Sequence, residues 1–319
     1  ARTAPSRAPR RWPGPARPCA LSSGGPCHDA HVLTAAELYE RARDANNSGR
    51  PLRARALFQQ ALASTDDQDL LARIECSLAY TESELGEAPT GLRQLDVAAV
   101  REGLTRETQG LIASQRGVIL MRIGDGAGAL VALTAAVDAL TEASSRGRAF
   151  LNRGLVHLQH GALDRAAKDF ASAADVFDSV GMSASRAKAQ HNLGYVTCLR
   201  GDLVEALRVM DLARPVLAPL SEASRAVGVA DKAEVLLSAG MPGAAAALLA
   251  EAARAFGAAR LRQSQGEAEV LLARTLEHTD PRAARRVARR AARRFARRGS
   301  ETWAVRAEAV RLRALLTVQ

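Results

Sequence analysis

The hydrophobic and polar positions of this chain follow a helical period in paired segments. The clearest pair runs from Arg186 to Leu217, with small or apolar residues on one face of each segment and Gly201 between the segments. Residues three and four positions apart share one face of an α-helix, so each segment predicts an amphipathic helix. Glycine adopts a left-handed turn conformation at little cost, which suits the break between two helices. The stretch therefore predicts one helical hairpin.

The hairpin pattern recurs along the chain. Its break falls at six glycines, in steps of 37, 38, 37, 40 and 39 residues: Gly49, Gly86, Gly124, Gly161, Gly201 and Gly240. Each glycine has a small residue seven positions before it and another five positions after it, where antiparallel helices must approach closely. A large apolar residue stands nine positions after the glycine and an alanine twelve positions after it. Such a period indicates stacked hairpins, each of which buries its apolar face against its neighbours.

A seventh copy of the pattern is weaker, as terminal repeats often are. It places Leu272, Thr279, Ala284, Ala288 and Ala291 in the five positions. We therefore predict an all-α protein whose residues 31–300 form a right-handed α-solenoid of about seven hairpins. Residues 1–30 are rich in proline and arginine and predict a disordered tail. Residues 301–319 predict one more helix, which either caps the array or begins a linker to a further domain.

The repeated order of small, turn, small, large and alanine resembles the tetratricopeptide repeat (TPR), over nearly all of residues 33–300. The resemblance implies a scaffold in which the first helix of each hairpin lines a concave groove. It also implies that the position two residues before the first small residue contacts bound peptides. Asn152 and Asn192 occupy this position, Gln115 and Asp231 occupy it in other hairpins, and His191 lies beside it. An Asn amide can both donate to and accept from a peptide backbone, and bonding to a neighbouring helix is an equal alternative.

Composition changes this picture little. The formal charge is +10, but only three of the 44 basic residues are lysines. A chain rich in alanine and arginine and poor in lysine is typical of a GC-rich genome, so we discount the global charge as a sign of an anionic partner. Aromatic residues make up 3% of the chain and leave little material for stacking on nucleic-acid bases.

The most unusual segment is arginine-rich and spans residues 282–298. It contains Arg282, Arg285, Arg286, Arg289, Arg290, Arg293, Arg294, Arg297 and Arg298, with no acidic residue among them. Small or apolar residues fall between the arginines and predict one amphipathic helix. Such a stripe is able to bind phosphates, RNA or an acidic protein. We favour the alternative of a solvated outer face, partnered by Glu267, Glu269, Glu301 and Glu308.

No catalytic or metal-binding pattern stands out in the sequence. His191 and Cys198 lie seven residues apart on one predicted helix, ~10 Å of rise, which is too far for contact. Cys19, Cys27, His28 and His31 offer zinc-ligand types without the spacing of a zinc module. We therefore predict a non-enzyme without a cofactor. No segment reaches about 18 uncharged apolar residues, so we expect no membrane span, and the irregular cysteines favour the cytoplasm.

A narrower resemblance concerns whole phrases of the sequence. The N-terminal repeat region of actinobacterial TPR proteins with a C-terminal CHAT domain resembles LYERARDANNSGR, LNRGLVHLQHGALDRAAKDF, HNLGYVTCLRGDLVEAL and DPRAARRVARRAARRFARRGSE. CHAT domains are caspase-like, and none lies within these 319 residues, so the resemblance assigns no catalytic residue here. It implies that the array is the regulatory or sensory arm of such a protein, with the CHAT domain following in cis. The alternative is a ligand- or peptide-sensing regulator, or a nucleic-acid adaptor that uses residues 282–298.

Overall fold

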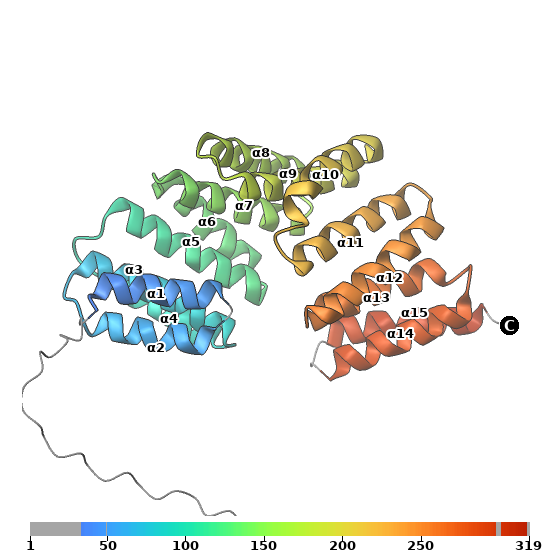
Figure 1. The fold of residues 1–319 in the computed structure, drawn as a ribbon, viewed down its shortest axis with the longest axis horizontal. Coiled ribbons are helices and arrows are strands. Elements are labelled where there is room, and N and C mark those ends of the chain that lie inside the picture. The colour runs from blue at the N-terminus through green and yellow to red at the C-terminus, as the bar shows by residue number, and fades with distance from the viewer. Residues whose placement is uncertain (1–32, 49, 298–300, 318–319) are drawn as a thin grey trace, which may run out of the picture. The chain divides into compact units, whose positions relative to one another are not determined.

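A computed structural model describes residues 33–48, 50–297 and 301–317. These residues form fifteen α-helices and no strand (Figure 1). The helices are α1 (Ala35–Asn47), α2 (Pro51–Leu62), α3 (Gln68–Glu84), α4 (Ala88–Ala99), α5 (Arg106–Ile123), α6 (Gly126–Ala139), α7 (Ala143–Gln159), α8 (Leu163–Ser179), α9 (Ser183–Leu199), α10 (Leu203–Leu217), α11 (Glu222–Ser238), α12 (Pro242–Ala258), α13 (Arg262–Leu276), α14 (Pro281–Ala296) and α15 (Glu301–Leu316). The tail over residues 1–30 and its candidate zinc ligands lie outside this description.

Consecutive helices pair into antiparallel hairpins, as predicted. Each odd-numbered helix packs against the even-numbered helix that follows it, and each hairpin packs against the next. The predicted breaks at Gly86, Gly124, Gly161, Gly201 and Gly240 all have positive φ, between 70° and 93°. A residue with a side chain is strained in this region, so glycine is required where the chain reverses. The all-α solenoid of helical hairpins is confirmed.

The core of each hairpin places a large side chain against a small one. Phe170 is fully buried, and a Cβ atom added to Gly154 would lie 2.7 Å from its ring. Leu133 is equally buried against Gly117, where an added Cβ would lie 2.5 Å from Leu133 Cγ. These pairs explain why the small and large positions recur together in the sequence. Any larger residue at the small position separates the two helix axes.

The last hairpin repeats the contact that Phe177 of α8 makes over Gly147 of α7. Phe295 of α14 is fully buried, and its ring lies 2.5 Å from the position that a Cβ on Gly266 of α13 would take. Trp303 of α15 stacks on Phe295, with ring centroids 5.6 Å apart. Ala307, Val310 and Ala314 of α15 are buried. The predicted apolar face of the final helix therefore packs against α13 and α14.

Two glycine-to-alanine substitutions test the role of close helix approach. A Cβ on Gly91 in α4 would lie 2.5 Å from the carbonyl oxygen of Ala79 in α3, so Gly91→Ala forces the two helices apart. We expect a loss of ~1–3 kcal/mol in stability. The matched control is Gly228→Ala in α11, where an added Cβ meets nothing within 4 Å.

Because alanine is the better helix former, we expect the control to gain ~0.5–1 kcal/mol. Thermal unfolding followed by circular dichroism measures both variants. Equal midpoints for the two would show that the small positions are not constrained by packing.

Candidate functional site

The first helices of the hairpins form a layer of their own. First helices of successive hairpins contact one another directly: α1 contacts α3, α3 contacts α5, α5 contacts α7, α9 contacts α11 and α13 contacts α15. The second helices have their close contacts with the first helices before and after them in the chain. The residues predicted to line the groove, Gln115, Asn152, His191, Asn192 and Asp231, all lie on first helices. This layer is one candidate site.

Side-chain hydrogen bonds tie most neighbouring first helices together. The hydroxyls of Tyr39 in α1 and Ser77 in α3 are 3.2 Å apart, within hydrogen-bond distance. Between α9 and α11, His191 Nε2 lies 2.7 Å from Asp231 Oδ2, and Tyr195 donates to Glu234 Oε2 at 2.6 Å. Arg313 of α15 donates to Glu277, which directly follows α13, at 2.9 Å. In the part of the chain that the structure describes, no side-chain hydrogen bond joins α7 to α9.

Asn152 in α7 and Asn192 in α9 lie at one place where this series of bonds is interrupted among the described residues, as it also is between α11 and α13. Both side chains are half-buried, and neither amide has a hydrogen-bond partner among the described residues. Neither is among the polar side chains whose atoms are buried without a partner, so the amide atoms reach solvent. Two amides at the same position of successive hairpins are thus available to an external ligand. The structure shows no bond from either to a neighbouring helix.

The other predicted groove residues are placed differently. His191 is buried and Asp231 is half-buried, and they satisfy each other across the α9–α11 interface. Gln115 in α5 points its amide nitrogen Nε2 into the protein, where it has no partner. The sequence pattern placed five residues in one group, whereas the structure leaves two of them, Asn152 and Asn192, with solvent-accessible and unpaired amides.

The sequence reasoning missed the pair of Tyr195 and Glu234. Burial raises the pKa of the Glu234 carboxyl, and the hydroxyl that Tyr195 donates to it acts in the opposite direction. Burial, together with the Glu234 carboxylate, raises the pKa of Tyr195. The two residues are 39 positions apart in the chain. That spacing equals one repeat. A search of the sequence for polar pairs at equivalent positions of neighbouring repeats would therefore have found these two residues.

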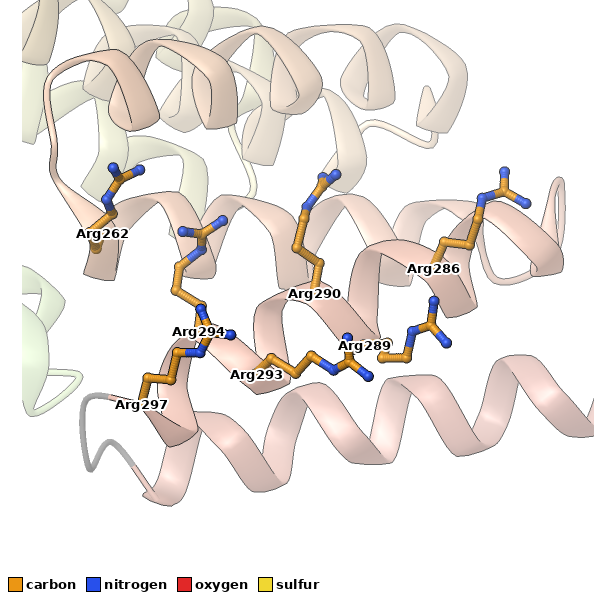
Figure 2. A pocket seen from close by; sticks show the side chains of 7 residues that line it. All are labelled: Arg262, Arg286, Arg289, Arg290, Arg293, Arg294 and Arg297. Atoms are coloured by element: carbon orange, nitrogen blue, oxygen red, sulfur yellow. The ribbon is translucent and has the colours of Figure 1, made fainter. Parts of the chain in front are cut away.

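A second candidate site lies on α14. Seven arginines line a cavity of about 580 Å³: Arg262, Arg286, Arg289, Arg290, Arg293, Arg294 and Arg297 (Figure 2). Arg262 begins α13; of the other six, five belong to α14 and Arg297 directly follows it. At ~100° per residue the six span ~140° of the helix, on the side opposite the buried Ala284, Ala288 and Phe295. Arg282 and Arg285 are exposed on the same helix and do not line the cavity.

One buried carboxylate anchors this arginine surface. Glu269 of α13 has a side chain that is 2% exposed, and it accepts from Arg290 Nε at 2.8 Å and from Arg294 Nη2 at 3.2 Å. A buried carboxylate requires such partners, since an unpaired buried charge is costly. Of the three expected acidic partners whose side chains the structure describes, only Glu269 contacts the stripe. Glu267 accepts from Gln263, Glu308 pairs with Arg311, and the Glu301 side chain lies outside the described residues.

The two cysteines within the described residues have an environment that suppresses their reactivity. Cys76 and Cys198 are both buried and free. Burial raises the pKa of the Cys76 thiol to about 12, and burial also raises the pKa of Cys198. A thiol with a raised pKa is a poor nucleophile. Within the described residues, no cluster of three or more histidine, cysteine or acidic side chains could hold a metal ion, and no helix is long and apolar enough to cross a bilayer.

Comparison with known proteins identifies the fold. No family model and no curated protein matches the chain. A Rap protein solved in complex with the Competence and Sporulation Factor is 13% identical, with a TM-score of 0.70 over 84% of this chain and 78% of that chain. A signal-transduction ATPase with a TPR sensor from Pyrococcus horikoshii is 13% identical, with a TM-score of 0.65 over 88% of this chain and 42% of that chain.

A TPR protein from Parabacteroides merdae is 16% identical, with a TM-score of 0.54 over 89% of this chain and 99% of that chain. The chain therefore has a TPR-like fold, which agrees with the repeat read from the sequence. Likenesses at these identities establish architecture, and binding properties do not transfer with them.

The pair of Glu234 and Tyr195 makes a prediction about pH. Because the pKa of Glu234 is raised above its ordinary value of 4.5, the folded protein binds this proton more tightly than the unfolded chain. Wild-type stability then falls as pH rises above 4.5 towards the raised pKa. Glu234→Gln removes this titration. The melting temperature of the variant should therefore rise relative to that of wild type as pH increases from 4.5 to the raised pKa.

Tyr195→Phe provides the complementary test. It removes the hydroxyl whose hydrogen bond lowers the pKa of Glu234. The pKa of Glu234 should therefore be higher in this variant, and the loss of stability should extend to higher pH. Melting curves measured over a series of pH values decide the matter. Parallel pH profiles for wild type and both variants would contradict the assignment.

Proposed function

We propose that this chain is a non-catalytic scaffold that binds a protein segment or peptide along its first helices, with Asn152 and Asn192 as backbone-binding residues. The observation that carries the proposal is the pair of solvent-accessible amides with no described partner, at the same position of α7 and α9. The neighbouring first helices α9 and α11 satisfy their polar groups with each other instead.

The chemistry of the amide suits an extended peptide. Each Asn side chain offers a carbonyl acceptor and an NH₂ donor, which match the N–H and C=O of one backbone residue. The two amides stand at the same position of successive first helices, and an extended peptide lying across these helices can present one backbone residue to each amide. Side chains of the peptide would then set specificity through the neighbouring surface.

The structural neighbours support a recognition role. One was solved in complex with the Competence and Sporulation Factor, and another is described as carrying a TPR sensor. We further propose that the array is the regulatory or sensory arm of a CHAT-domain protein in the cytoplasm. That part rests on the resemblance of four sequence phrases, and a downstream His and Cys pair in the same reading frame would support it. A stop codon directly after Gln319 would contradict it.

Removal of the two amides tests peptide binding. Peptides are first selected from a display library on the immobilised 319-residue chain, and their affinities are then measured by isothermal titration calorimetry. Asn152→Ala with Asn192→Ala should weaken binding about tenfold, because up to four backbone hydrogen bonds are lost. The melting temperature should hardly change, since neither amide bonds to the protein.

Gln60→Ala is the matched control, because Gln60 is an exposed amide on a second helix. Its effect on affinity should be negligible. Selected peptides that bind the double variant as tightly as wild type would exclude these amides from the recognition surface.

A further inference from the structure

We propose that the arginine-lined cavity on α14 binds a chain of phosphate groups, such as a short polyphosphate. The inference is independent of peptide binding by α7 and α9, since it concerns another surface. It rests on the geometry of seven guanidinium groups around one cavity of about 580 Å³. Figure 2 shows the side chains of Arg262, Arg286, Arg290 and Arg294 extending in one direction.

The positive charge of this cavity is largely uncompensated. Glu269 neutralises part of the charge of Arg290 and Arg294, and it is almost completely buried beneath them. Arg262 donates to the side-chain oxygen of Gln265 at 3.0 Å, which is a neutral acceptor. In the described part of the chain, no ion pair engages Arg262, Arg286, Arg289, Arg293 or Arg297. Like charges at helical spacing repel one another, so this arrangement destabilises the free protein.

The repeat fold does not require arginine in this cluster. Arg289, which has no described ion pair, stands ten positions after the break of its hairpin, and none of the residues at the same position of the other six hairpins is basic: Gln59, Asp96, Thr134, Ala171, Asp211 and Ala250. Packing accepts a short, a branched or an acidic side chain there. The cluster is therefore not explained by the repeat. A bound anion explains it, because it offsets the repulsion.

The lining selects the chemistry of the ligand. Every lining residue is an arginine, so the cavity offers planar, bidentate donors that match phosphate oxygens. Among the described lining residues, none is an aromatic residue on which a base could stack, which argues against recognition of RNA. None of these residues is an apolar residue that could anchor an acidic protein. A row of guanidinium groups along one helix, joined by Arg262, fits a short linear chain of phosphates.

The experiment titrates sodium tripolyphosphate into the full chain by isothermal titration calorimetry at ~0.15 M ionic strength. The test variant is Arg289→Gln with Arg293→Gln, because both residues line the cavity and neither has a described ion pair. The control is Arg282→Gln with Arg285→Gln, which removes the same charge from exposed positions of the same helix outside the cavity. Both variants spare Arg290, Arg294 and Glu269, so the buried anchor is kept.

We expect the test variant to bind tripolyphosphate at least about tenfold more weakly than wild type, and the control to stay within about twofold. Ligand should raise the melting temperature of wild type and of the control more than that of the test variant. Two further arms separate the sources of phosphate. ATP should bind no more tightly than tripolyphosphate, and single-stranded RNA of equal charge should bind more weakly.

Three results would overturn the proposal. The first is the absence of tripolyphosphate binding to wild type at this ionic strength. The second is an equal loss in both double variants, which would indicate diffuse attraction to the whole helix. The third is tighter binding of RNA or of an acidic peptide than of tripolyphosphate, because either would make this surface an interface for a macromolecule.

Discussion

Every hairpin of this protein depends on one steric constraint, the contact of a large apolar side chain with a residue that has almost no side chain. Phe170 over Gly154 and Leu133 over Gly117 are two instances. Dispersion and the burial of apolar surface stabilise a hairpin only when the helix axes come near enough for the side chains to interlock. Seven repetitions of this contact produce an array without a single central core. Each hairpin is stable because of its neighbours, so stability in this molecule is a local property that adds along the chain.

The same constraint explains how much of the fold could be predicted from the sequence. The contact is made between residues a fixed number of positions apart, so it leaves a periodic signal that survives without any knowledge of homologues. The glycine breaks are visible for the same reason, since a positive φ at Gly124 or Gly201 permits few other residues. The last hairpin was harder to recognise because Leu272 and Thr279 stand where the other hairpins have a small residue and a glycine. Its contact of Phe295 with Gly266 nevertheless repeats that of Phe177 with Gly147.

The candidate sites were less predictable, because their polar contacts cross between hairpins. Asn192 and His191 are adjacent in sequence, yet one has a solvent-accessible amide and the other is bonded to Asp231 in the next first helix. A small rotation of one helix decides which of two adjacent side chains faces its neighbour. Arg262 joins the arginines of α14 from the start of another helix, and no local pattern marks it. The arginines themselves were evident, but their scarcity of acidic partners was apparent only in three dimensions.

The interruption of polar contacts between α7 and α9 also has a mechanical meaning. On either side of it, hydrogen bonds such as those of Tyr39 with Ser77 and Tyr195 with Glu234 resist sliding of one first helix past the next. Between α7 and α9 only the packing through α8 resists it, and apolar packing tolerates small shear better than a directional bond does. The joint between α7 and α9, like that between α11 and α13, therefore lacks a directional bond that would resist shear among the described residues. A molecule that bridges α7 and α9 would restrict the movement of one helix past the other. It would thereby couple the motion of the hairpins before this joint to that of the hairpins after it.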